Sequence, residues 1–188
     1  MFSCSATKYV PENGSLLDKY KVEVDDVAFN KKELNDYIKQ KPNKKVLFWK
    51  FYLSLYNLSD PEKENGLNNW LRDIGEPPVI FDRDLMENST QQLRLFMNNK
   101  GYYNAEVMDT VITRDRRARV EYRVVSHTPY RIRAINYFFE DANLSFMVLA
   151  DTGQNKFRSG ELFDIEVLQK EMVRIETVLR DSGYFGFT

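Results

Sequence analysis

The sequence is poor in the residues that build most catalytic and metal sites. It has one cysteine and one histidine among 188 residues, which excludes an intramolecular disulfide, a multi-cysteine metal cluster and a pair of histidines within one chain. A formal net charge of −1 argues against a nucleic-acid binder that works through a broad basic surface. No apolar run approaches the ~20 residues of a membrane-spanning helix. Phosphate-binding loops, nucleophile elbows and metalloprotease helices are also missing from the sequence. The composition therefore favours a protein that is not an enzyme.

The apolar residues that are present suffice for a folded core. Hydrophobic residues make up 43% of the chain and aromatic residues 14%, which argues against global disorder. Because domains usually hold roughly 100–150 residues, a chain of 188 residues corresponds to one large domain or two small ones.

A repeat with an offset of 82 positions (163 − 81) organises the chain. Residues 81–103 align without gaps with residues 163–185, and both copies begin with an aspartate that suits a helix N-cap and end with a glycine that suits the left-handed position after a helix. These residues are Asp82 and Gly101 in the first copy and Asp164 and Gly183 in the second. Between them the apolar positions agree at helical spacing, Leu85, Met86, Leu93, Phe96 and Met97 corresponding to Val167, Leu168, Ile175, Val178 and Leu179. The pattern predicts one amphipathic helix that occurs twice.

Alternating polar and apolar residues predict strands around each copy of this helix. The elements expected in the first unit are a strand at 20–24, a helix at 30–40, the repeated helix, and strands at 103–113 and 117–125. The second unit begins on the same plan, with a strand at 130–135 and a weaker helix at 144–149. It ends at Thr188, before positions equivalent to the last two strands.

The sequence thus predicts an α+β fold with two domains in tandem, each ordered strand–helix–helix–strand–strand, the helices covering one face of a small sheet. We expect a flexible N-terminal tether at 1–18 and a first domain at 19–127 with a helical insertion at about 43–75. The second domain, 128–188, is expected to lack its C-terminal strands.

These motifs resemble the periplasmic POTRA repeats of the BamA/TamA superfamily of outer-membrane assembly factors. In that family the second helix typically ends in Gly-Tyr-aromatic, as Gly101-Tyr102-Tyr103 and Gly183-Tyr184-Phe185 do here. A narrower resemblance, to lipid-anchored TamA-like (TamL-type) proteins of Bacteroidota, is carried by residues 4–11, 56–58 and 74–79.

The resemblance implies a non-enzymatic scaffold on the periplasmic side of a bacterial outer membrane, with no cofactor and no nucleic-acid partner. Its expected partners are a TamB-like periplasmic protein or unfolded outer-membrane protein substrates, and its expected attachments are a lipid anchor and a β-barrel beyond Thr188. Cys4, preceded by the small residue Ser3, is the expected lipidation site. The alternatives are a POTRA-type scaffold of another envelope system, such as two-partner secretion or cell division, and a lipid-handling enzyme.

β-Augmentation is the binding mechanism that this fold suggests. The strand at 103–113 is expected at the edge of the sheet, where unpaired backbone groups accept an extended peptide with little sequence preference. The candidate binding residues are Tyr103, Ala105, Val107, Asp109 and Val111.

The insertion contains the most apolar stretch of the sequence, residues 46–58. One interpretation is a helix buried against the sheet of the first unit, which is the simpler interpretation because an isolated apolar patch is a liability. The other is an exposed surface for a partner or the membrane interface, with amphipathic aromatic anchors. The residues of this candidate surface are Phe48, Trp49, Phe51, Tyr52 and Tyr56.

Overall fold

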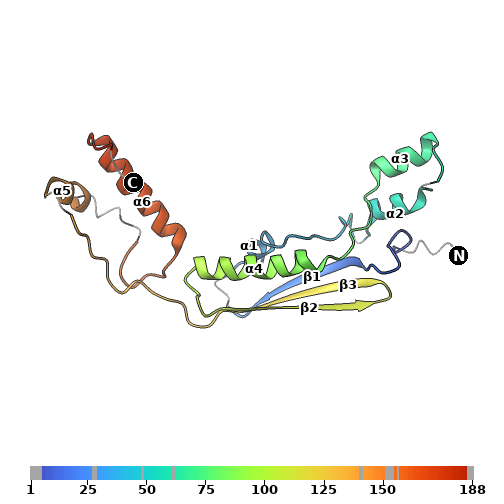
Figure 1. Cartoon of the computed structure of the whole chain (residues 1–188), viewed down its shortest axis with the longest axis horizontal. Coiled ribbons are helices and arrows are strands. Elements are labelled where there is room, and N and C mark those ends of the chain that lie inside the picture. The colour runs from blue at the N-terminus through green and yellow to red at the C-terminus, as the bar shows by residue number, and fades with distance from the viewer. Residues whose placement is uncertain are drawn as a thin grey trace. The chain divides into compact units, whose positions relative to one another are not determined.

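The structure is a computed structural model that describes residues 6–26, 29–47, 49–60, 62–139, 142–150, 155 and 157–185. In chain order the elements are β1 (Leu16–Val24), α1 (Lys31–Asn35), α2 (Phe51–Leu58), α3 (Gly66–Ile74), α4 (Arg83–Asn99), β2 (Glu106–Arg114), β3 (Arg117–Val125), α5 (Ala142–Ala150) and α6 (Ile165–Asp181) (Figure 1). They form two compact units: unit 1 holds residues 1–93 and 106–125, and unit 2 holds residues 94–105 and 126–188. Among the described residues, no helix has the length and apolar character that crossing a bilayer requires.

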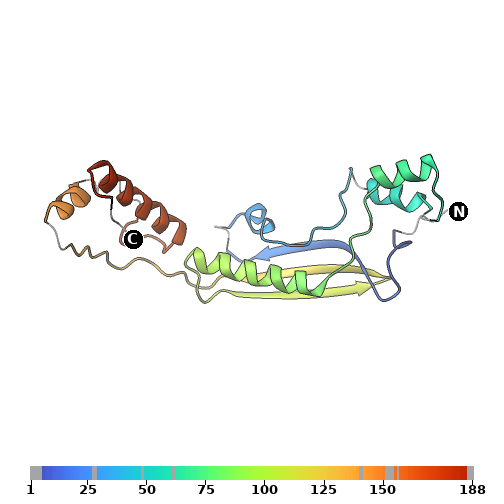
Figure 2. The same cartoon turned by 45° about the horizontal axis from the view of Figure 1, so that its top comes forward.

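Unit 1 is built on a three-stranded sheet with the order β1-β3-β2. β1 runs parallel to β3, and β2 runs antiparallel to it. Figures 1 and 2 show α1 and α4 on one side of this sheet. The residues of β3 that face this side are buried, whereas the alternate ones, such as Arg117 and Arg123, are exposed. The buried set is Ala118, Val120, Tyr122 and Val124. One face of the sheet therefore carries the core, as alternation in β3 predicts.

A two-residue turn joins β2 to β3. Its central residues, Asp115 and Arg116, have φ angles of 51° and 59°, the left-handed values that the favoured hairpin turns require. The register that follows pairs Arg114 with Arg117. It also buries Val107 and leaves Met108 exposed, which decides a facing that the sequence leaves ambiguous.

The repeated helix is confirmed. α4 and α6 each have 17 residues, and they begin and end 82 positions apart (165 − 83 and 181 − 99). Asp82 accepts a hydrogen bond from the Leu85 amide at 3.1 Å, and Asp164 accepts one from the Glu166 amide at 2.8 Å. Both helices end in the same hydrogen-bond pattern, in which the tyrosine amide after the glycine donates to a carbonyl five residues earlier. The glycines adopt φ angles of 86° at Gly101 and 92° at Gly183.

The strand expected at 130–135 does not form. Only Arg131 makes a β-bridge, to Leu162, and the surrounding residues are irregular. In unit 1 the equivalent strand, β1, is stabilised by pairing along its length with β3. Among the described residues, the backbone hydrogen bonds of the 130–135 segment join only Tyr130 and Ile132 to Gly101 and to residues 160–163, so the pairing is too short to form a strand.

The expected tether at 1–18 is also corrected. β1 begins at Leu16, and Val10 is buried together with Leu16 and Leu53. Arg116 donates to the carbonyl oxygen of Pro11 at 3.0 Å. Residues 6–18 are therefore part of unit 1, because their few apolar side chains complete a small core that the composition of the segment does not reveal.

Candidate functional site

The edge of the sheet formed by β2 is the first candidate surface. Among the described residues, Met108–Arg114 have no backbone hydrogen bond to any segment other than β3. Of the proposed binding residues, Val107, Asp109 and Val111 lie in this strand with their side chains toward the helix-covered face. Asp109 is also held by the Thr90 hydroxyl, which donates to it at 2.6 Å.

The opposite edge, formed by β1, is partly covered. The Leu17 amide donates to the Val79 carbonyl oxygen at 2.8 Å, and the Phe81 amide donates to the Ser15 carbonyl oxygen at 2.7 Å. Leu16 and Ile80 form an antiparallel bridge between these bonds. The start of the β1 edge is thus covered by the 79–81 segment, whereas Met108–Arg114 of β2 have no such backbone partner among the described residues.

Tyr103 and Ala105 are not part of the edge strand, which begins at Glu106. The Ala105 amide donates to the Tyr102 carbonyl oxygen at 3.1 Å, so this segment forms a turn after α4. The Tyr103 ring contacts the ring of Tyr130 edge-on, with 5.3 Å between centroids. The alternation of the sequence predicts a strand from residue 103, but the hydrogen bonds of the turn after α4 reach Ala105. The strand therefore begins only at Glu106.

The second candidate surface is a tight turn in the insertion. Val46 and Trp49 exchange backbone hydrogen bonds, with N–O distances of 2.8 and 3.2 Å. The exposed fraction is 89% for Leu47 and 76% for Trp49. Together with Val46 and Phe51 these side chains line an apolar hollow of about 360 Å³. We call Val46, Leu47, Trp49 and Phe51 the apolar turn.

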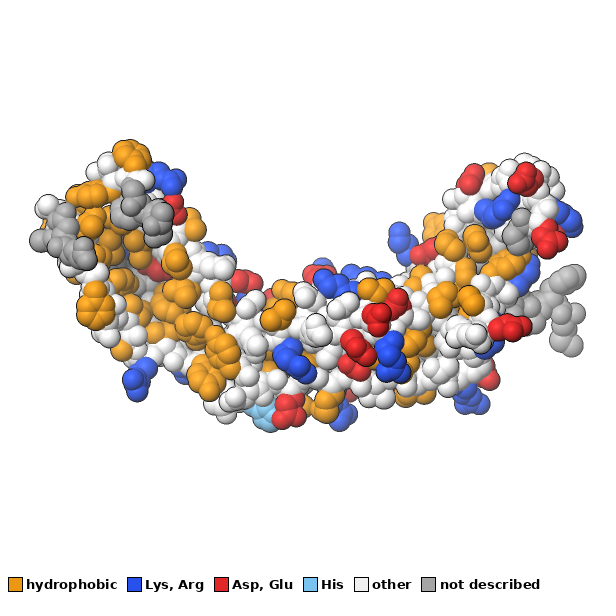
Figure 3. Space-filling view, viewed as in Figure 1, with side chains coloured by type: hydrophobic (Ala, Val, Ile, Leu, Met, Phe, Trp, Pro, Cys, Tyr) orange, Lys and Arg blue, Asp and Glu red, His pale blue; other side chains and the backbone are white. Residues whose placement is uncertain are grey.

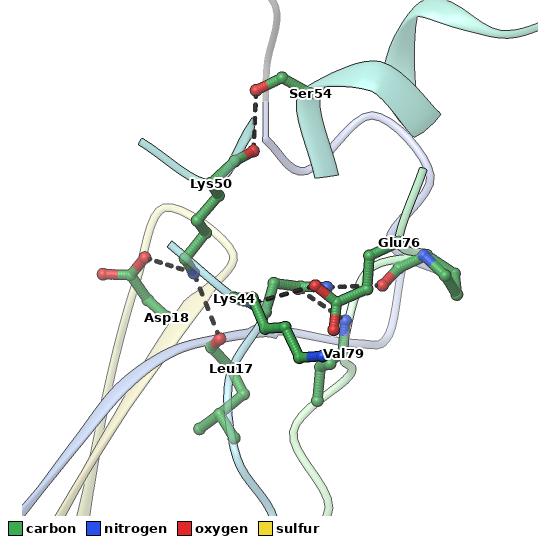
Figure 4. Close-up of polar contacts among 9 residues, drawn as sticks. Leu17, Asp18, Lys44, Lys50, Ser54, Glu76 and Val79 are labelled. Carbon is green, nitrogen blue, oxygen red and sulfur yellow. Dashed lines mark hydrogen bonds and ion pairs between the residues drawn. The ribbon is translucent and has the colours of Figure 1, made fainter. Parts of the chain in front are cut away.

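Polar contacts fix the base of the apolar turn to the rest of unit 1 (Figure 4). Lys50 Nζ donates to Asp18 Oδ1 at 2.9 Å and to the Leu17 carbonyl oxygen at 3.4 Å. The Lys44 amide donates to Glu76 Oε2 at 2.9 Å. The buried amide of Asn43 donates to the Pro77 carbonyl oxygen at 2.7 Å and accepts from the Val79 amide at 3.0 Å. The two sides of the turn are therefore anchored, and the apolar side chains are presented on a fixed base.

The ion pair at this base shifts both of its pKa values. Burial raises the pKa of Asp18, but the hydrogen bond and the charge of Lys50 lower it by more. The pKa of Asp18 therefore lies below its ordinary value of 3.8. Burial lowers the pKa of Lys50 from 10.5, and the hydrogen bond to Asp18 opposes that change. Both groups are charged at neutral pH, so the base of the turn carries a half-buried ion pair.

Acidification should weaken this anchor. Because the pKa of Asp18 is lowered in the folded state, its contribution to stability is complete above the ordinary value of 3.8 and is lost as the pH falls through the lower folded-state value. The measurement is the free energy of urea unfolding for the native chain and for Asp18→Asn across this range. We expect the difference between them to be constant at neutral pH and to shrink in acid. A difference that does not change with pH would contradict the assigned role of Asp18.

The two helices of the insertion combine burial and exposure. In α2, Leu53 is buried with Val10 and Leu16, whereas Tyr52 and Tyr56 are half-buried. The Tyr56 ring contacts the ring of Tyr9 edge-on, with 5.8 Å between centroids. Figure 3 shows hydrophobic side chains exposed beside α2 in the right-hand part of the view. The interpretation of the whole stretch as a buried helix is therefore wrong for its first residues and correct for Leu53.

The sequence also contained a signal for the apolar turn that its hydrophobic residues alone do not reveal. Between Asp36 and Asp60 there is no acidic residue, although the whole chain has a net charge of −1. The same interval contains five lysines, namely Lys39, Lys41, Lys44, Lys45 and Lys50.

Two proposed site residues, Cys4 and Phe48, lie outside the described residues. Among those that the structure describes, no group of three or more histidine, cysteine, aspartate or glutamate side chains is placed to hold a metal ion.

Comparison with known families identifies the architecture of unit 1. The POTRA model, described as surface antigen variable number repeat, matches residues 21–126, from within β1 to the residue after β3. The chain belongs to the POTRA family. The POTRA match includes the insertion with α2 and α3, and it confirms the α+β POTRA fold expected from the sequence.

A POTRA structure is also among the solved structures that the chain resembles. This is the crystal structure of Haemophilus influenzae BamA POTRA3-5, with 11% identity, coverage of 94% of this chain and 90% of that chain, and a TM-score of 0.31. None of the curated proteins matches the chain.

Proposed function

We propose that the chain is the periplasmic POTRA region of an outer-membrane protein assembly or translocation factor. It acts as a non-enzymatic scaffold that binds partner or substrate chains by β-augmentation. Membership of the POTRA family supports this role, since POTRA domains are periplasmic parts of outer-membrane proteins. The observation that carries the binding mechanism is the open edge of β2.

The hairpin turn sets which backbone groups of β2 point outward. A two-residue turn makes the flanking pair, Arg114 and Arg117, a hydrogen-bonded pair, and such pairs alternate along an antiparallel ladder. Asp109, Val111 and Thr113 then fall in the non-hydrogen-bonded pairs with β3. Their N–H and C=O groups are directed away from β3, toward an incoming strand.

Side chains beside this edge favour an apolar, extended partner. Met108 and Ile112 lie on the uncovered face of β2, with exposed fractions of 48% and 51%. Alternate side chains of an added strand would pack beside them, while its backbone extends the sheet. Unfolded outer-membrane protein substrates, whose strands alternate apolar and polar residues, have this pattern.

The narrower assignment is also a proposal. We infer a TamA-like factor in which the first POTRA domain includes residues 6–18 and extends to residue 127, and 128–188 belongs to a second. Acylation of Cys4 would attach it to the outer membrane, and a TamB-like periplasmic protein would be a partner. The duplication of α4 in α6, with the same caps at both ends, supports the second domain.

Proline at Val111 should weaken substrate binding without unfolding the sheet. Proline removes an N–H that faces away from β3, which an edge strand tolerates, and its ring obstructs the approach of another strand. We expect crosslinking of nascent outer-membrane proteins to a photoreactive residue at Thr110 to fall by on the order of tenfold, the size of a lost hydrogen bond with its steric penalty.

The matched control is Val111→Ala, which shortens the same side chain and keeps the N–H. We expect Val111→Ala to retain crosslinking, and circular dichroism should show native structure in both variants. Equal crosslinking in Val111→Pro and the native chain would refute β-augmentation at this edge. Equal loss in both variants would assign the effect to the valine side chain instead.

A further inference from the structure

The tip of the apolar turn exposes two large apolar side chains to solvent. Leu47 and Trp49 are among the most exposed large apolar residues of unit 1, at 89% and 76%. Among the described residues, the polar contacts that join this loop to the rest of unit 1 come from Asn43, Lys44 and Lys50 at its base. Burial in unit 1 therefore does not explain the choice of leucine and tryptophan at the tip.

The backbone at Leu47 makes this choice costly. Its φ angle is +58°, in the left-handed region that asparagine and glycine tolerate and a branched aliphatic residue disfavours. A leucine that is both strained and solvent-exposed gains neither conformational nor burial free energy. Strain of this kind is maintained where the side chain has a use outside the folded unit.

The charges around the turn indicate the chemistry of the surface that it meets. Lys41, Lys44 and Lys45 are exposed and precede the tip, whereas the charge of Lys50, which follows it, is paired with Asp18. No acidic residue lies between Asp36 and Asp60 in the sequence, so the loop is locally cationic in a chain that is almost neutral. An apolar tip with tryptophan, flanked by lysines, is the arrangement of segments that enter the interfacial layer of a bilayer with anionic lipid.

We propose that the apolar turn is a membrane-interface anchor, with Leu47 and Trp49 inserting among the headgroups and upper acyl chains of an anionic bilayer while Lys44 and Lys45 contact lipid phosphates. This goes beyond the proposed scaffold function, because it uses an insertion on a different part of unit 1 from the β2 edge. The fixed base favours insertion, since a preorganised tip loses little conformational freedom when it binds.

A lipid surface fits the apolar turn better than a folded protein partner does. The anionic surface of a bilayer satisfies several lysines at once without requiring defined geometry, whereas a protein interface needs specific acceptors for each. The turn also presents only four described apolar side chains, a small area for a stable protein interface but enough for peripheral insertion.

Vesicle binding by the full chain of 188 residues tests the proposal. All vesicle measurements use Trp70→Phe as the background variant. This substitution leaves Trp49 as the single tryptophan of a chain that has two. With vesicles of phosphatidylcholine and phosphatidylglycerol, we expect the Trp49 emission to shift to shorter wavelength and to be quenched by bromine-labelled acyl chains. Vesicles of phosphatidylcholine alone should bind several-fold more weakly.

Leu47→Asn separates membrane binding from folding. Asparagine suits the positive φ at position 47, so Leu47→Asn should be at least as stable as the Trp70→Phe background. Its vesicle affinity should nevertheless fall by about tenfold or more. Lys44→Glu with Lys45→Glu should lower the affinity for anionic vesicles by about fivefold per residue, corresponding to the loss of each cation near the surface. The control pair is Lys31→Glu with Lys32→Glu, two lysines of α1 in the same unit.

The same experiments distinguish membrane binding by the apolar turn from binding through another surface and from self-association of the chain. Unchanged vesicle affinity in Leu47→Asn overturns the proposal, because binding would then use another surface. Self-association that depends on Leu47, without vesicle binding, would assign the turn to a second copy of the chain and also overturn it. Vesicle binding by Val111→Pro at the native level is expected, so failure of the β2 proposal and failure of this one are separable.

Discussion

Leu53→Ala should lower the free energy of unfolding of unit 1 by about 2–5 kcal/mol. Leu53 has an exposed fraction of 1% and packs in a small cluster with Val10 and Leu16. This cluster joins α2 to the N-terminal segment and to the start of β1. Removing three carbons from its centre leaves a cavity that so small a cluster cannot fill by relaxation. Urea unfolding followed by circular dichroism measures the change.

Leu58→Ala is the matched control for this substitution. Leu58 is on the same helix, α2, but has an exposed fraction of 57%. The same chemical change at this position should alter the free energy of unfolding by about 0.5 kcal/mol or less. Similar losses in Leu53→Ala and Leu58→Ala would mean that α2 is not held to β1 through Leu53, and the insertion would then unfold independently of the sheet.

The parts of the fold that local chemistry specifies were predictable from the sequence. α4 and α6 are defined by an aspartate cap, an apolar stripe and a terminal glycine, all within one segment of chain. The hairpin between β2 and β3 is likewise local, and its second arm, β3, has the expected alternation. For such elements the interactions that decide the structure lie within a few residues, so the pattern alone is sufficient.

Elements whose extent depends on distant partners were predicted less well. The helix expected at 30–40 ends at Asn35, and the Lys39 amide donates to the Ser89 hydroxyl oxygen of α4 at 3.0 Å instead of continuing the helix. The end of α1 is thus set by a residue far along the chain. The same reason applies to the 130–135 segment, which has the alternation of a strand but only one bridge.

For the candidate surfaces, too, the sequence predicted some features and could not predict others. That β2 lies at an edge follows from the strand order of the fold, and the sequence predicted it. Hydrophobicity could not separate Leu53, which is buried, from Trp49, which is exposed, because both belong to one apolar stretch. What separates them is the turn at 46–49 and the polar contacts of Asn43 and Lys50, which are tertiary features. Charge was the usable signal, since exposed lysines immediately precede the exposed start of the stretch.

Gly101→Ala should be the most damaging substitution among the described glycines of unit 2. Gly101 has a φ of +86°, and a Cβ added there would lie 2.5 Å from the Phe163 carbonyl oxygen. The positive φ alone costs about 1–2 kcal/mol for alanine. Relieving the close contact must displace Phe163, whose amide donates to the Tyr130 carbonyl oxygen at 3.0 Å. Overpacking of this kind costs a further ~1–3 kcal/mol, so the free energy of unfolding should fall by about 2–5 kcal/mol.

The repeat supplies the control for Gly101→Ala within the same chain. Gly183 occupies the equivalent helix end with a φ of +92°, but nothing lies within 4 Å of a Cβ added there. Gly183→Ala therefore carries the conformational strain without the steric contact, and we expect it to cost only about 1–2 kcal/mol. The difference between the two variants measures the packing of Phe163 against the end of α4. If both variants lost the same stability, the backbone strain would account for the whole effect, and Gly101 would serve only to end the helix.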